Sequence, residues 1–190
     1  MWGKHGRIWI PIGVTLLLMF GALLPSVFAA SDVPQEVRNI NTVGDSSFPN
    51  QFTPVGEAVF FTAEDRTNGR ELWITDAAGT RLVRDINPGA ASSNPAELTA
   101  IGNVLFFVAS DATNGDALWR SDGTQAGTTL VRVINPEIAG FSITGLVNLN
   151  GTLIFAADDG TTGFELWRSD GTGGGTARVR DIRPGAQGSF

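Results

Sequence analysis

Short turns that carry aspartate are the parts of this 190-residue chain whose side chains could do chemistry. Asp122-Gly123-Thr124 and Asp170-Gly171-Thr172 repeat one pattern, and Asp158 and Asp159 form an adjacent pair. Calcium binds about six to eight oxygens. One aspartate per turn supplies too few, so Asp122, Asp158, Asp159 and Asp170 are calcium candidates only together with other loop oxygens. Asp-Gly is first of all a hairpin turn signal, and no cofactor is expected.

Other catalytic chemistry has few residues to use. The chain has no cysteine, and its one histidine, His5, lies in an apolar N-terminal segment. Beyond that segment a histidine base and the thiol and Schiff-base nucleophiles are therefore excluded. Two of the 19 acidic residues could form a carboxylate pair for glycoside cleavage, but no spacing marks two of them as convergent. The sequence predicts no enzyme, and a polysaccharide hydrolase or lyase is the alternative.

The N-terminus has the pattern of a secretory signal peptide. Lys4 and Arg7 precede an almost wholly apolar run over 8–24, and a proline and small residues follow it. The run is also long enough to be an uncleaved membrane anchor. We predict a signal peptide over residues 1–29 and a polar lead-in over 30–36. The protein is then secreted, extracellular or displayed on the cell surface.

The charge of the mature chain excludes two classes of partner. Cleavage after residue 29 removes Lys4 and Arg7, so the 13 basic residues fall to 11 against 19 acids, a formal charge of −8. An acidic surface without a basic patch argues against nucleic acid and anionic lipid. Membrane contact is expected only through an uncleaved signal segment. Without cysteine no disulfide framework forms, so packing or a bound ion must stabilise the fold.

One stretch occurs three times and organises the chain. Each copy holds a Leu-Trp pair followed three residues later by aspartate: Leu72, Trp73 and Asp76; Leu118, Trp119 and Asp122; Leu166, Trp167 and Asp170. The tryptophans are 46 and 48 residues apart. Such a period is typical of one supersecondary unit per repeat, stacked on its neighbours. We predict repeats at about 42–87, 88–135 and 136–183 in a domain over 37–190.

Each repeat contains four short segments typical of strands. They are 52–55, 58–63, 71–75 and 81–86; 98–101, 104–109, 117–121 and 129–134; and 143–149, 152–157, 165–169 and 177–182. Apolar runs bounded by turn residues indicate buried strands, and no helical periodicity follows residue 35. We predict an all-β, β-propeller-like array of about three four-stranded antiparallel blades. A β-solenoid is the competing architecture.

The ring of blades is predicted to be incomplete. Val37–Asn41 aligns with Val83–Asn87, the fourth strand and end of the first repeat, but the three strands that would precede it are missing. Three blades are also fewer than the usual range of about four to eight. Two hypotheses follow. Either the chain is a fragment of a longer array, or copies of it associate to close the ring.

The repeat resembles the ELWxxDGT repeat family of secreted bacterial proteins, some of which are labelled hyalin-like. The resemblance covers about Val37 to Gly185, and it is strongest in the third repeat, at Glu165, Leu166, Trp167, Asp170, Gly171, Thr172, Thr176, Asp181, Ile182, Pro184 and Gly185. The first repeat has Ala77-Ala78 and a shorter loop, and the second has Ala117 in place of glutamate and Val133 in place of aspartate. The resemblance implies a secreted repeat fold without an established enzymatic activity.

These residues together predict an interaction module. We interpret the three tryptophans as wedges between blades, and the Arg-Asp pairs Arg84-Asp85 and Arg180-Asp181 as solvated charges at outer strand edges. An unknown protein or glycan ligand would dock on the variable hairpins of one face. Two alternatives stay open. One is a calcium-stabilised adhesion module, whose melting temperature a chelator would lower, and the other is a propeller-type polysaccharide hydrolase or lyase.

Overall fold

Twelve antiparallel strands make up the part of the chain that the computed structural model describes, residues 37–41, 44–136, 142–185 and 188. The predicted signal peptide and lead-in, residues 1–29 and 30–36, lie outside these ranges. Within the ranges no helix is long and apolar enough to cross a bilayer.

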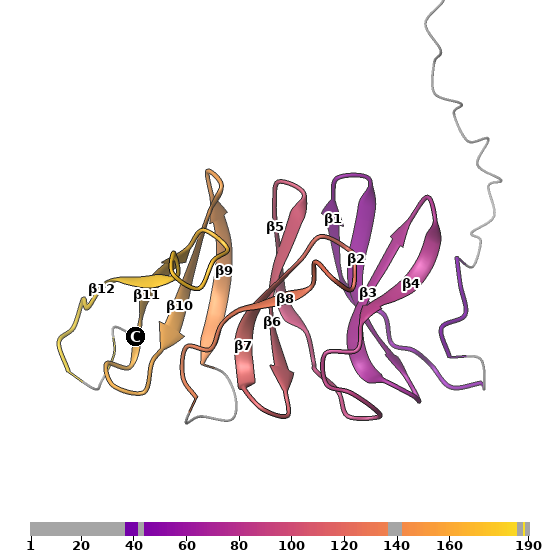
Figure 1. Cartoon of the computed structure of the whole chain (residues 1–190), viewed down its shortest axis with the longest axis horizontal. Coiled ribbons are helices and arrows are strands. Elements are labelled where there is room, and N and C mark those ends of the chain that lie inside the picture. Colours follow the sequence, from indigo (N-terminus) through magenta and orange to yellow (C-terminus); the bar gives the residue numbers. More distant parts are fainter. Residues whose placement is uncertain (1–36, 42–43, 137–141, 186–187, 189–190) are drawn as a thin grey trace, which may run out of the picture. The chain divides into compact units, whose positions relative to one another are not determined.

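The strands form three sheets of four, and in each sheet they pair in chain order (Figure 1). Blade A contains β1 (Asn50–Val55), β2 (Ala58–Asp65), β3 (Gly69–Asp76) and β4 (Gly79–Arg84). Blade B contains β5 (Ala96–Ile101), β6 (Val104–Asp111), β7 (Gly115–Ser121) and β8 (Thr129–Arg132). Blade C contains β9 (Ile143–Leu149), β10 (Thr152–Asp158), β11 (Phe164–Ser169) and β12 (Ala177–Arg180). The predicted propeller-like array of three antiparallel blades is confirmed, and the sheets do not close on one another.

The fourth strands end two residues earlier than predicted, at Arg84, Arg132 and Arg180. In blades A and C a buried glutamate binds the chain just beyond this end, whereas blade B ends at the same position with Ala117 in place of the glutamate. The amide of Ile86 donates to Glu71 Oε2 at 3.1 Å, and the amide of Ile182 donates to Glu165 Oε2 at 3.0 Å. In these two blades a side chain thus accepts the hydrogen bond of the amide two residues beyond the strand.

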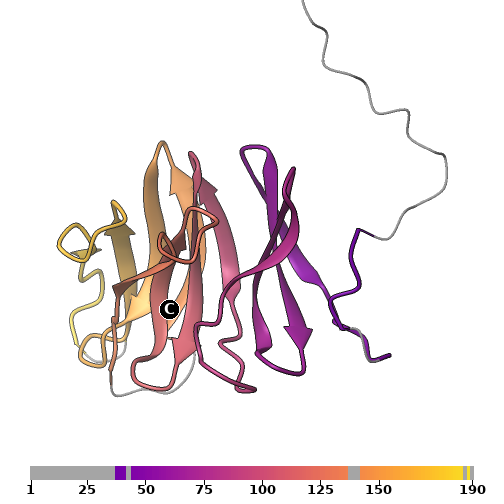
Figure 2. The same cartoon turned by 45° about the vertical axis from the view of Figure 1, so that its right-hand side comes forward.

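The first strands of neighbouring blades lie beside one another, which places the fourth strands on the outside (Figure 2). Side chains join these inner strands. The carboxylate of Glu97 in β5 accepts from the amides of Gly145 and Leu146 in β9 at 2.9 and 3.2 Å. Gln51 of β1 donates to the carbonyl of Pro95, just before β5, at 3.1 Å. Both Gln51 and Glu97 lie in strand bulges and have positive φ angles of 55° and 59°.

Each blade has two unlike faces, because neighbouring residues in a strand point to opposite sides. We call them the Trp face and the Leu face after the adjacent Leu-Trp pair. The Trp face of blade B packs on the Leu face of blade A, so Trp119 lies in one buried cluster with Phe60 and Leu72. The Trp face of blade C packs on the Leu face of blade B in the same way, and Trp167 joins Phe106 and Leu118. Trp119 and Trp167 therefore lie between the blades.

The Trp face of blade A is covered differently. Trp73 forms a small buried cluster with Phe61 and Ala63, and Ile40 packs against it. Ile40 belongs to Val37–Asn41, the piece that aligns with the fourth strands. This segment supplies to blade A the outer part of the contact that a preceding blade would make.

The arginines that end the fourth strands of blades A and B reach across to the next blade, and Arg38 in Val37–Asn41 makes the equivalent contact to blade A. The guanidinium of Arg84 lies 5.9 Å from the centre of the Trp119 ring and donates to the carbonyl of Thr128 at 2.7 Å. Arg132 donates to the carbonyl of Thr176 at 3.3 Å, and Arg38 donates to that of Thr80. The hypothesis of solvated charges is wrong for Arg84, because it joins two blades.

Glu71 is a fully buried acid that joins three segments. Its carboxylate accepts from the amide of Ile86 and from the amide of Ser93, the latter at 2.8 Å. The Ser93 hydroxyl also donates to this carboxylate, at 2.5 Å. Ser93 lies in the connection from blade A to blade B. Burial raises the pKa of Glu71 to about 7, although these hydrogen bonds act in the opposite direction. Blade B has Ala117 at this position, so it lacks the connection.

We predict that Trp119→Ala lowers the free energy of unfolding by about 3–5 kcal/mol, because it empties a site between two blades and removes the 3.1 Å hydrogen bond from Nε1 to the Ala109 carbonyl. Leu130→Ala, on the exposed side of β8, should cost about 1 kcal/mol or less. Urea unfolding followed by circular dichroism measures both. Equal losses would contradict the role of Trp119 between the blades.

We predict that Glu71 makes stability depend on pH. An acid whose pKa is higher in the folded state favours folding when protonated, so its contribution is complete below its ordinary value of 4.5 and is lost as the pH rises to about 7. The loss is on the order of 3 kcal/mol. Urea unfolding at a series of pH values should show it in the parent chain and not in Glu71→Gln. Glu57→Gln, at an exposed turn, is the control that should retain it.

Candidate functional site

The aspartate loops between the third and fourth strands are held by their own side chains. In blade B, Asp122 Oδ1 accepts from the amide and the hydroxyl of Thr124 at 2.9 and 2.7 Å. The Thr124 hydroxyl in turn accepts from the amide of Gly127 at 2.9 Å. Ser121 and Thr128 close the base of the loop through a hydroxyl pair at 2.7 Å. Hydrogen bonds from Thr124 hold the pKa of Asp122 below its usual range.

Blade C repeats this loop with the same contacts. Asp170 Oδ1 accepts from the amide and hydroxyl of Thr172 at 2.9 and 2.7 Å, and the amide of Gly175 donates to the Thr172 hydroxyl at 2.9 Å. The glycine just before the last threonine of each loop, Gly127 or Gly175, cannot be replaced by a larger residue without a clash. A Cβ atom on Gly175 would lie 2.0 Å from Asp170 Oδ1, and one on Gly127 would lie 2.1 Å from Asp122 Oδ1. The Asp-Gly-Thr motif is thus a self-contained loop.

Blade A has a shorter hairpin with a different arrangement. The amide of Ala78 donates to Asp76 Oδ1 at 2.8 Å. Arg81 holds the same carboxylate with both guanidinium nitrogens, at 2.9 Å to Oδ1 and 2.8 Å to Oδ2. Hydrogen bonds from Arg81 lower the pKa of Asp76. The ion pair is partly exposed at the end of the blade.

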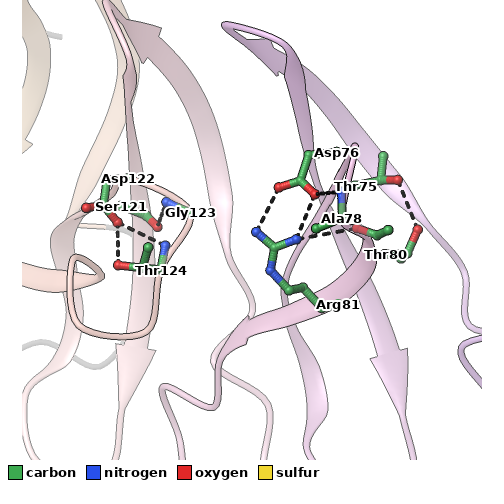
Figure 3. A network of polar contacts seen from close by, with 10 residues as sticks. Thr75, Asp76, Ala78, Thr80, Arg81, Ser121, Asp122, Gly123 and Thr124 are labelled. Carbon is green, nitrogen blue, oxygen red and sulfur yellow. Dashed lines mark hydrogen bonds and ion pairs between the residues drawn. The ribbon is translucent and has the colours of Figure 1, made fainter.

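The short hairpin of blade A and the Asp122 loop of blade B face one another across an open groove of about 590 Å³ (Figure 3). Apolar side chains and polar groups from both blades line it: Val55, Phe60 and Ile74 among the former, and Glu57, Asp76, Arg81, Asn103, Asp122 and Thr124 among the latter. Three of these residues are acids and one is a base. The groove therefore has an apolar component and an excess of negative charge, an arrangement suited to a neutral or cationic ligand.

The corresponding place between blades B and C is occupied by a side chain. Arg120 stands there in the position of Ile74, and it donates to the carbonyl of Gly171 at 3.3 Å. The hairpin of blade B is also two residues longer than that of blade A. The shorter hairpin of blade A and the presence of Ile74 in place of an arginine therefore leave the groove between blades A and B open.

The remaining calcium candidates are also engaged in local hydrogen bonds. Asp158 Oδ1 accepts from the amide of Gly160 at 2.8 Å. Partial burial raises the pKa of Asp159, but hydrogen bonds from Thr161 and Thr162 outweigh it and lower the value to about 2. Among the described residues no three acidic or histidine side chains gather in a group that could hold a metal. The calcium-stabilised module therefore stays an alternative hypothesis.

The residues predicted from the sequence divide into those that hold the blades together, those that line the groove and those that do neither. Trp73, Trp119 and Trp167 and the buried Leu72 and Leu118 form the frame, whereas Asp76 and Asp122 line the groove. Leu166, Asp158, Asp159 and Asp170 do not line it. Sequence reasoning missed Arg81 and Ile74. The first hairpin is two residues shorter than the other two, and this difference in the sequence could have pointed to the groove.

Comparison with known proteins identifies no family. No protein-family model matches the chain, and a search of the curated proteins finds no match. Among solved structures, the chain is similar to the crystal structure of a computationally designed protein, Ika8, with 20% identity and a TM-score of 0.37. The match covers 74% of this chain and 37% of the designed one, so this chain spans well under half of that protein. A similarity of this size supports no inference about function.

We predict that Gly175→Ala destabilises the fold by about 1–3 kcal/mol, because the added methyl group displaces the Asp170 carboxylate from its hydrogen bonds. Gly174→Ala is a matched control one residue away, since a Cβ atom there meets nothing within 4 Å. Urea unfolding measures both. If the control costs as much as Gly175→Ala, the motif is not explained by contact with Asp170.

Proposed function

We propose that the protein is a secreted or cell-surface binding module whose blades act as a rigid frame and whose ligand site is the groove between blades A and B. The observation that carries the proposal is the difference between the two joints. The frame residues recur, but the shorter hairpin at Asp76 and the replacement of arginine by Ile74 leave the groove open at one joint. Loops that vary on a constant frame are typical of binding surfaces.

The composition of the groove suggests the class of ligand. Val55, Phe60 and Ile74, each 7% exposed or less, form only a narrow apolar floor, and Asn103 and Thr124 offer hydrogen-bond partners. The acids Glu57, Asp76 and Asp122 outnumber Arg81, whose guanidinium is already bound to Asp76. A neutral glycan or a protein segment with basic side chains fits these groups better than an anion does.

A hairpin exchange tests the groove. Replacing Asp76–Gly79 by the longer blade B sequence Asp122–Gly127 should close the groove and lower the affinity for a ligand at least about tenfold, a loss of about 1.4 kcal/mol. Ligands come from a panel of neutral oligosaccharides and basic peptides screened by binding to the immobilised chain, with titration calorimetry for each hit. The matched control places the same blade B sequence over Asp170–Gly175, away from the groove. Binding that survives closure of the groove would contradict the proposal.

A further inference from the structure

The Leu face of blade C lies open although the equivalent faces of blades A and B are covered. The leucine of the repeat is fully buried as Leu72 and Leu118 but 38% exposed as Leu166. The valine and isoleucine at the end of the fourth strand change in the same way: Val83, Ile86, Val131 and Ile134 are 5–9% exposed, whereas Val179 and Ile182 are 49% and 60% exposed. Among the described residues of blade C, this face is thus both apolar and exposed.

The Trp face of blade A is only partly covered. Val37–Asn41 packs on Trp73, but Phe52 of β1 is 62% exposed. Its equivalents in the other blades are covered by the preceding blade. Leu98 packs into the cluster between blades A and B, and Leu146 is buried between blades B and C. A cavity of about 170 Å³ lies between Val37–Asn41 and blade A, next to Phe52.

We propose that these two surfaces bind each other between two copies of the chain, so that the Leu face of blade C in one copy packs on the Trp face of blade A in the next. This contact is independent of the ligand groove. It repeats an interface that the chain already contains twice, with leucine, valine and isoleucine at matching positions on the Leu side and a tryptophan on the other. Ile154 stands where blades A and B have a phenylalanine. The partner that we propose for each surface is therefore a second copy of this chain.

The arginine contacts extend to this interface. Arg38, Arg84 and Arg132 each donate to a threonine carbonyl at the base of the following hairpin. Arg180 holds the same position in blade C and is exposed. In the proposed contact Arg180 donates to the carbonyl of Thr80 in the second copy and lies over its Trp73 ring.

The contact requires an exchange of segments. Val37–Asn41 reads Val-Arg-Asn-Ile-Asn, and residues 179–183 read Val-Arg-Asp-Ile-Arg. Both segments fit one position beside Trp73, so the incoming fourth strand displaces Val37–Asn41. Blade C also brings β9, β10 and β11, which cover Phe52, whereas Val37–Asn41 leaves it exposed. The larger apolar burial favours the exchange. Because the two surfaces differ, the association is head to tail and gives a ring or an open chain of copies.

Sedimentation velocity of the full chain over a range of concentrations tests the proposal with three point variants. Val179→Asp places a charge on the open Leu face and should raise the dissociation constant at least about tenfold. Ile40→Asp weakens the competing segment and should lower the constant about tenfold. Ala112→Asp, in the exposed β6–β7 hairpin, should change nothing. All variants keep residues 1–36, so any association through the N-terminal segment contributes equally to every measured constant.

Cross-linking tests the direction of the contact, since the chain has no cysteine of its own. An Arg180→Cys chain mixed with a Thr80→Cys chain should give a bismaleimide-linked dimer in several-fold excess over either chain alone. Linkage of the Arg180→Cys chain to itself would instead show that two blade C faces meet, and it would overturn the proposal. A parent chain that stays monomeric at all concentrations, or a Val179→Asp variant that associates like the parent, would overturn it as well.

Discussion

The burial of a tryptophan against the leucine face of the preceding blade is the contact on which the described structure depends. A four-stranded sheet with two apolar faces is not stable in water by itself, because both faces need a cover. Trp119 and Trp167 provide one cover and Leu72 and Leu118 provide the other. Arg84 adds a polar contact at the rim of the same joint. Blade B is therefore completed by a neighbour on both faces, and blades A and C by a neighbour on one face each.

This dependence explains which residues recur and which vary. Residues that face a neighbouring blade are restricted by packing on both sides, whereas the hairpins at the ends of the strands are held mainly by their own hydrogen bonds and by a few contacts from the preceding blade. The Asp122 and Asp170 loops satisfy themselves through Thr124 and Thr172. Blade A replaces that network by the Asp76–Arg81 ion pair and keeps the frame unchanged. The hairpin can thus differ between blades while the apolar contacts of the joints are kept.

The sequence was sufficient for the strands and blades because the repeat displays one pattern three times. It predicted the tryptophans as wedges from their place after leucine in a strand. It did not predict that Arg84 crosses to the next blade, since alternation along a strand tells which face a residue occupies and not how far its side chain reaches. The groove was missed for a similar reason. It arises from two missing hairpin residues and from Ile74 in the place of arginine, and only the structure places these next to Asp122.

The joints differ in their polar contacts although their apolar contacts agree. Glu71 connects the end of β4 with Ser93, and thereby fixes the chain that leads from blade A to blade B. Blade B has Ala117 instead, and the hydroxyl of Ser142, before β9, has no hydrogen-bond partner among the described residues. A buried hydroxyl without a partner costs free energy. The joint between blades B and C has other polar contacts in return, since Glu97 accepts from the amides of Gly145 and Leu146 and Arg120 donates to the carbonyl of Gly171. The apolar clusters are thus alike at the two joints, and the polar groups that support them differ.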